Sequence, residues 1–165
     1  MKSLALAAAF SLMALGAHAQ NVVQNAAQIA KVQDGQNCPR CELYQVDLYN
    51  RQVKAKDFHG AHMREGDLSL SVFNKANFAR ADLKDVNAYG ALFAGADLHD
   101  ADLTDASFVG AYLVGANLKG ANLTGANFAG AQLDKAVGLT NSQLAKACGD
   151  DTTTLSKGLH IPVCK

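Results

Sequence analysis

The feature that most constrains the fold of this chain is a period of five residues. Read from Ala76, the sequence runs ANFAR, ADLKD, VNAYG, ALFAG, ADLHD, ADLTD, ASFVG, AYLVG, ANLKG, ANLTG, ANFAG and AQLDK. Nearly every block begins with a small residue, has Asp or Asn or another polar residue second, and carries a large apolar residue third. The same phase extends backwards to Cys41, so nineteen consecutive blocks cover the 95 residues Cys41–Lys135.

A five-residue period fits neither an α-helix nor a flat strand. Apolar residues five apart would spiral around a helix, and they do not alternate as a strand requires. A chain that turns a corner every five residues does explain the pattern. Four blocks would then make one square coil, with the first and third side chains of each block pointing inward. Such coils would stack like parallel strands, roughly 4.8 Å apart.

These blocks resemble the pentapeptide-repeat family, whose consensus is A(D/N)LXX. The resemblance implies an all-β solenoid, a right-handed quadrilateral β-helix of about five coils, with the central Leu or Phe and the preceding small residue filling its interior. Residues twenty apart should therefore stack, so that Phe78 lies on Phe58 and Phe93 on Phe73. Ala88 is the only small residue in the central ladders, and the larger Val86 beside it should compensate for the lost volume.

The segments outside the repeat predict an export signal and two caps. Residues 1–19 read as a secretory signal peptide, with an apolar run and cleavage expected after Ala19. The protein is therefore expected in the periplasm or outside the cell. Residues 20–40 would form an N-terminal cap, with a short helix within 21–33. Residues 136–165 would form a C-terminal cap, with a helix over 139–147 that is capped by Thr140 or Asn141.

Four cysteines flank the repeat region as two local pairs, Cys38 with Cys41 and Cys148 with Cys164. In an exported chain, disulfides are expected before metal ligation. Three connectivities are possible, and the local one is favoured by the separation of the pairs. The Cys38-Pro39-Arg40-Cys41 sequence is also typical of thiol-disulfide redox proteins, and a metal or interchain role stays open.

The composition argues against several functions. Without residues 1–19, the chain carries 14 basic and 15 acidic side chains, which argues against binding to a phosphate backbone. No nucleophile, zinc or phosphate-loop motif is present, so we expect neither an enzyme nor a cofactor. No later segment is long and apolar enough for a membrane span.

Two outward surfaces stand out from the repeat. The first is an apolar strip where polar residues are normal; its members are Val72, Tyr89, Leu92, Ala94, Val109, Tyr112 and Val114. Exposed apolar patches often contact another protein. The strip is therefore predicted to bind a protein partner or a second copy, unless the C-terminal tail or the N-terminal helix covers it.

The second surface is an acidic patch without matched bases, formed by Asp82, Asp85, Asp97, Asp100, Asp102 and Asp105. It would attract a basic partner or a divalent cation, but a local structural role at the corners is favoured.

The sequence thus predicts a non-catalytic binding or structural protein. The first alternative is a redox protein that uses Cys38 and Cys41. The second follows from the resemblance alone: some pentapeptide-repeat proteins bind a DNA topoisomerase by imitating DNA. The export signal and the near-zero charge argue against it here.

Overall fold

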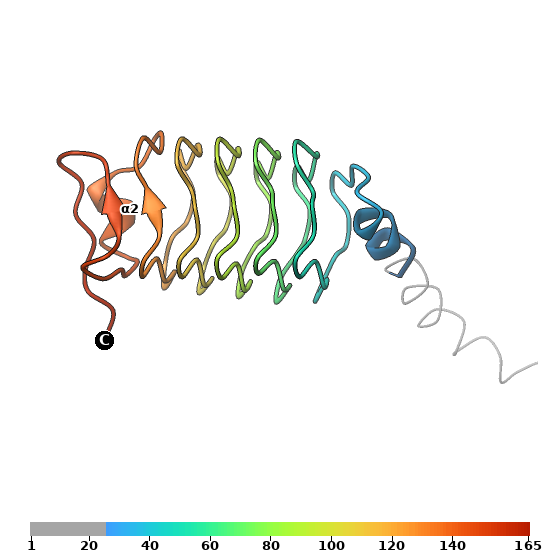
Figure 1. Cartoon of the computed structure of the whole chain (residues 1–165), viewed down its shortest axis with the longest axis horizontal. Coiled ribbons are helices and arrows are strands. Elements are labelled where there is room, and N and C mark those ends of the chain that lie inside the picture. The colour runs from blue at the N-terminus through green and yellow to red at the C-terminus, as the bar shows by residue number, and fades with distance from the viewer. Residues whose placement is uncertain (1–25) are drawn as a thin grey trace, which may run out of the picture.

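The computed structural model describes residues 26–165 as a rod of stacked coils with a cap at each end (Figure 1). The expected signal peptide and its cleavage site lie outside these residues. Parallel bridges join residues twenty apart, in four columns that correspond to the four sides of a coil. One column runs through Glu42, His62, Asp82, Asp102 and Asn122. The pairing therefore follows the twenty-residue repeat that the sequence predicts.

Regular strands are short in this rod. The named strands are β1 (Gln132–Leu133) and β2 (Thr154–Leu155), which pair in parallel. Elsewhere the coils are joined by isolated bridges, because each side has only about three extended residues before the next corner. The fifth residue of each block lies in the left-handed region, as at Asp85 with φ 56° and Gly110 with φ 66°. This conformation explains why glycine is frequent there.

The interior is a column of apolar layers. Phe58 stacks on Phe78 with ring centroids 5.0 Å apart, Phe73 on Phe93 at 5.2 Å, and Phe108 on Phe128 at 5.4 Å. These pairs are the ladders predicted from the period. Burying each such side chain stabilises the fold by roughly 1.5–3 kcal/mol. Ala88 and Val86 are both buried, as expected for volume compensation within one layer.

The N-terminal end is closed by a helical segment, residues 26–33, in the region where the sequence predicts a capping helix. The Gln33 side-chain amide donates to the Asp47 backbone carbonyl at 3.0 Å, and the Gln28 side-chain oxygen accepts from the Glu42 backbone amide at 2.7 Å. The Cys38 backbone amide already donates to the Asp57 carbonyl at 2.8 Å, so the ladder begins before Cys41.

The C-terminal end differs from the prediction. Helix α2 covers only Asn141–Leu144, with Thr140 as its N-cap and Gln143 completing a capping box. It is shorter than the predicted 139–147 because Cys148 pairs with Asn127 in the ladder. Together with β2, these residues form a further, irregular turn of the rod. The hydrogen-bonded ladder therefore continues past Lys135, although the five-residue period does not.

Candidate interaction surface

The predicted apolar strip lies on one side of the rod. Val72 pairs with Leu92, and Leu92 pairs with Tyr112, in the column that also contains Gln52 and Gln132. Second-position side chains point outward, so these residues form one continuous row. The structure thus brings the three central members of the strip together. It places Tyr89 and Val109 at the preceding corner and Ala94 and Val114 at the following one, each twenty residues apart.

Exposure differs along the strip. Tyr89 is 55% exposed and Leu92 is 38% exposed, whereas Val72 is only 8% exposed. Val72 therefore contributes little accessible surface, contrary to the expectation for an outward position. The remaining members are half-buried: Ala94, Val109, Tyr112 and Val114. The accessible part of the strip is centred on Tyr89 and Leu92.

Leu70 also belongs to this surface, although the predicted strip does not include it. It is 44% exposed and has a φ of 56°, a conformation that bulky residues rarely adopt. A Cβ built at Gly90 would lie 2.8 Å from Leu70 Cδ2, so the Leu70 side chain covers the Gly90 corner, next to Tyr89. The sequence does indicate that Leu70 is unusual, because it occupies a fifth position where the next three coils have glycine.

Neither terminal segment covers the strip within residues 26–165. The helical segment at 26–33 bonds to the first coil, at Glu42 and Asp47. The C-terminal tail extends the rod at its other end, where Thr154 follows Gln132 in the strip's own column. Figure 1 shows both segments at the ends of the rod. Within the described residues, the strip is therefore not covered by either terminal segment.

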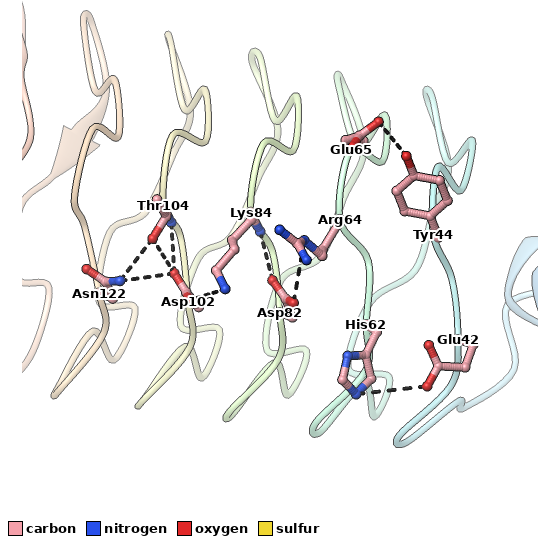
Figure 2. Close-up of polar contacts among 10 residues, drawn as sticks. All are labelled: Glu42, Tyr44, His62, Arg64, Glu65, Asp82, Lys84, Asp102, Thr104 and Asn122. Carbon is pink, nitrogen blue, oxygen red and sulfur yellow. Dashed lines mark hydrogen bonds and ion pairs between the residues drawn. The ribbon is translucent and has the colours of Figure 1, made fainter.

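The acidic patch has basic partners, contrary to the prediction. The Lys84 amine lies 2.9 Å from the Asp102 carboxylate, and Arg64 lies 3.7 Å from Asp82 (Figure 2). Each base occupies the fourth position of one block and reaches the second position one coil further along. Partial burial acts to raise the pKa of Asp102, but hydrogen bonds from Thr104 and Lys84 outweigh it and hold this pKa below its ordinary value.

The other acidic residues of the patch have local roles. Asp97 accepts from His99 Nδ1 at 2.8 Å, and Asn117 donates to the same carboxylate at 3.0 Å. Three further members are exposed corner residues in the left-handed region: Asp85, Asp100 and Asp105. Second-position Asp and Asn side chains also accept from the backbone two residues on, as Asp82 does from the Lys84 amide at 3.3 Å. Asp82, Asp97 and Asp102 therefore accept backbone hydrogen bonds at corners, and the carboxylates of the patch do not converge on one point within residues 26–165.

The four cysteines form the two local disulfides, Cys38–Cys41 and Cys148–Cys164, as the sequence predicts. Cys38 is fully buried in the core and Cys41 packs against it. Cys148 pairs with Asn127 in the ladder, and the Cys164 backbone amide donates to the Gly149 carbonyl at 2.8 Å. Each disulfide therefore closes one end of the rod.

Within residues 26–165, no cluster of three or more His, Cys, Asp or Glu side chains is arranged to hold a metal ion. None of the helices in the same range has the length and apolar character that crossing a bilayer requires.

The fold defines a class of protein, the right-handed quadrilateral β-helix. The family profile for pentapeptide repeats matches in 8 copies, over residues 57–87, 81–120 and 101–137. The chain belongs to the pentapeptide-repeat family.

The chain is similar to several solved structures of pentapeptide repeat proteins. The pentapeptide repeat protein Rfr23 from the cyanobacterium Cyanothece 51142 is 22% identical; the match covers 80% of this chain and 97% of that one, with a TM-score of 0.53. The pentapeptide repeat protein alr5209 from Nostoc Pcc 7120 is 29% identical over 82% and 87% of the two chains, with a TM-score of 0.35. HetL from Nostoc sp. Strain PCC 7120, a pentapeptide repeat protein involved in heterocyst differentiation regulation, is 26% identical over 76% and 61%, with a TM-score of 0.40. A comparison with curated protein sequences gave no match.

Proposed function

We propose that this protein is a non-catalytic binding module of about five coils, which holds another protein surface against its apolar strip. The observation that carries this proposal is the row of exposed apolar side chains on one side of the rod. Leu70, Tyr89 and Leu92 are between 38% and 55% exposed, and Leu70 and Leu92 stand at positions where the repeat often has glycine or a polar residue. Contiguous apolar surface of this kind is stabilised when a partner removes it from water.

We place this module in the periplasm or outside the cell. The N-terminal apolar run and the Ala17-His18-Ala19 site support secretion with cleavage after Ala19. The two disulfides support an oxidising compartment, because disulfides persist there and are rare in the cytosol. N-terminal sequencing of the secreted protein tests this placement, and a chain that begins at Gln20 is the expected result.

The alternative thiol-disulfide role depends on access to the Cys41 sulfur. Exchange needs a disulfide sulfur that another thiolate reaches; Cys38 has no accessible surface, and Cys41 is only partly exposed at the end of the core. Because both cysteines pack at the end of the apolar core, we assign Cys38–Cys41 a structural role. A reduction potential below roughly −300 mV would agree with this role, and a much higher potential would favour the redox function.

The DNA-mimic alternative is disfavoured by the pairing of charges. A surface that imitates DNA needs continuous negative charge, but Arg64 and Lys84 interrupt the acidic column. Equal numbers of acidic and basic side chains in the whole sequence point the same way.

Site-specific photo-crosslinking in living cells tests the binding proposal. A photoreactive residue replaces Leu92 in one variant and Asn122 in a control variant. Both are exposed second-position residues, but they lie in different columns of the rod. We expect cross-linked protein from position 92 and not from position 122. Equal products at both positions, or none at position 92, would refute the proposal.

A further inference from the structure

We propose that the partner of the apolar strip is a second copy of this chain, docked face to face and antiparallel, with a two-fold axis at the level of Leu92. This inference rests on the proposed function. In such a dimer the two rods run in opposite directions, and the axis crosses the interface perpendicular to them. A two-fold interface has to be complementary to itself, which is a strong restriction on an irregular surface.

Because the rod is regular, a two-fold axis fixes which residues of the two copies face each other. With the axis at Leu92, a coil that precedes Leu92 in one copy faces the coil that follows Leu92 by the same number of coils in the other copy, and the facing residues occupy the same position of the five-residue block. Leu92 then faces Leu92 of the other copy. Residues one coil away on either side face each other, so Val72 meets Tyr112. Residues two coils away do so as well, and Gln52 meets Gln132.

Large side chains meet open positions in this arrangement. Leu70, which is 44% exposed, faces Gly110, where a Cβ would find nothing within 4 Å. Lys75 faces Gly115, which is equally open. Tyr49, which is 53% exposed, faces the small Ala129. At these three positions a large side chain of one copy thus lies over a small residue of the other, whereas Tyr89, which lies in the axis coil and is 55% exposed, faces Tyr89 of the other copy.

The charges at the rim also match. Lys54 in the first coil faces Asp134, which lies four coils further along in the same fourth position. Within residues 26–165, neither side chain takes part in an ion pair of its own. The symmetry brings them together twice in the dimer, once on each side of the axis. Opposite charges placed in this way favour one relative orientation of the two copies.

A parallel dimer, with the two rods running in the same direction, fits less well. Each coil would then face the same coil of the other copy, with its two corners exchanged. Leu70 would face Asn74, and Lys54 would face Asn50, so the apolar side chain and the charge would both lack a partner. The antiparallel arrangement is therefore the one that the surface supports.

The interface is small. Five coils span about 24 Å along the rod, and one side is roughly 10 Å wide before the corners are added. Even with both corners, each copy buries less than the roughly 800 Å² of a standard interface. We therefore expect a weak dimer, with a dissociation constant of roughly 10–100 µM.

Charge exchange tests the proposal directly. The purified protein and the variants Lys54→Asp, Asp134→Lys and the double variant are compared by sedimentation equilibrium, up to about 500 µM, well above the expected dissociation constant. We expect each single variant to weaken dimerisation roughly fivefold, and the double variant to return to within about twofold of the native protein. Lys119→Asp, an exposed lysine outside the strip, is the matched control and should change nothing.

Two results would overturn the proposal. A native protein that is monomeric at every concentration rules out the dimer, and a double variant that fails to recover rules out the antiparallel register. Thermal melting of each variant confirms that it is folded. A monomeric protein that still cross-links to a different protein through position 92 would leave the proposed function standing and remove only the dimer.

Discussion

Substitution of Gly138 by alanine is expected to destabilise the C-terminal cap. Gly138 has a φ of 76°, and a Cβ there would lie 2.6 Å from the Cα of Lys119 and 2.8 Å from its backbone nitrogen. These atoms belong to the backbone of the preceding coil, so no side-chain rotation relieves the contact. The two coils have to move apart at this corner.

The expected loss of stability has two parts. Placing alanine in the left-handed region costs about 1 kcal/mol relative to glycine. Separation of the coils also weakens the hydrogen bonds on either side, from the Leu118 amide to the Val137 carbonyl and from the Val137 amide to the Ala116 carbonyl, both 2.8 Å long. At about 1 kcal/mol each, these bonds bring the total to about 3 kcal/mol.

Gly158→Ala is the matched control. Gly158 also has a positive φ, 86°, but a Cβ there would have nothing within 4 Å. The control should lose only the conformational part, about 1 kcal/mol, or about 2–4 °C in Tm, whereas Gly138→Ala should lose about 6–12 °C. Hydrogen exchange at the Leu118 amide should accelerate in the Gly138 variant alone. Equal shifts for the two variants would refute the steric argument and show that the cap moves away from Lys119 without cost.

Three further predictions concern the caps and the charged column. Replacing Cys148 and Cys164 by serine removes a crosslink between residues 16 apart, which should lower the free energy of unfolding by about 3 kcal/mol. A denaturant titration with and without reductant measures this loss. A native protein that reductant does not destabilise would contradict the prediction. Hydrogen bonds from Thr152 and the Gly130 backbone lower the pKa of Asp150 to about 2. Because this folded-state pKa is below the unfolded value, its contribution is present above about pH 4 and is lost as the pH falls towards 2, so the Tm difference between native protein and Asp150→Asn should shrink over that range. A constant difference would exclude this linkage. Lys84→Met should raise the pKa of Asp102, measured by carbon NMR titration, whereas Lys119→Met should not.

The interior of the rod was predictable because one rule places every residue. A corner every five residues puts Phe73 under Phe93 and Phe108 under Phe128, and the structure confirms both stacks. Volume compensation between Ala88 and Val86 follows from the same rule. Prediction worked here because each contact repeats a neighbouring one, so many weak signals agree.

The acidic surface and the C-terminal cap were not predictable in the same way. Lys84 pairs with Asp102 because its long side chain extends to the adjacent coil, although the two residues are eighteen apart in the sequence. The pattern of single blocks does not predict such a contact. The end of α2 was misplaced because Cys148 gains a ladder position next to Asn127, and this tertiary hydrogen bonding outweighs the local tendency to continue the helix. Neither the Lys84–Asp102 pair nor the end of α2 follows from the five-residue period.

The square cross-section restricts how such a chain changes during evolution. Loss or gain of twenty residues would add or remove one coil and leave every column intact. Loss of five residues within the repeat would keep the period and the core, but it would turn all later residues onto the next side. If the loss falls between Val72 and Tyr112, this row would then be divided between two sides, and stacks such as Phe73 on Phe93 would be exchanged for other apolar contacts. Surviving insertions and deletions in relatives that share this surface should therefore occur in multiples of twenty residues, whereas relatives under selection for the fold alone should tolerate multiples of five.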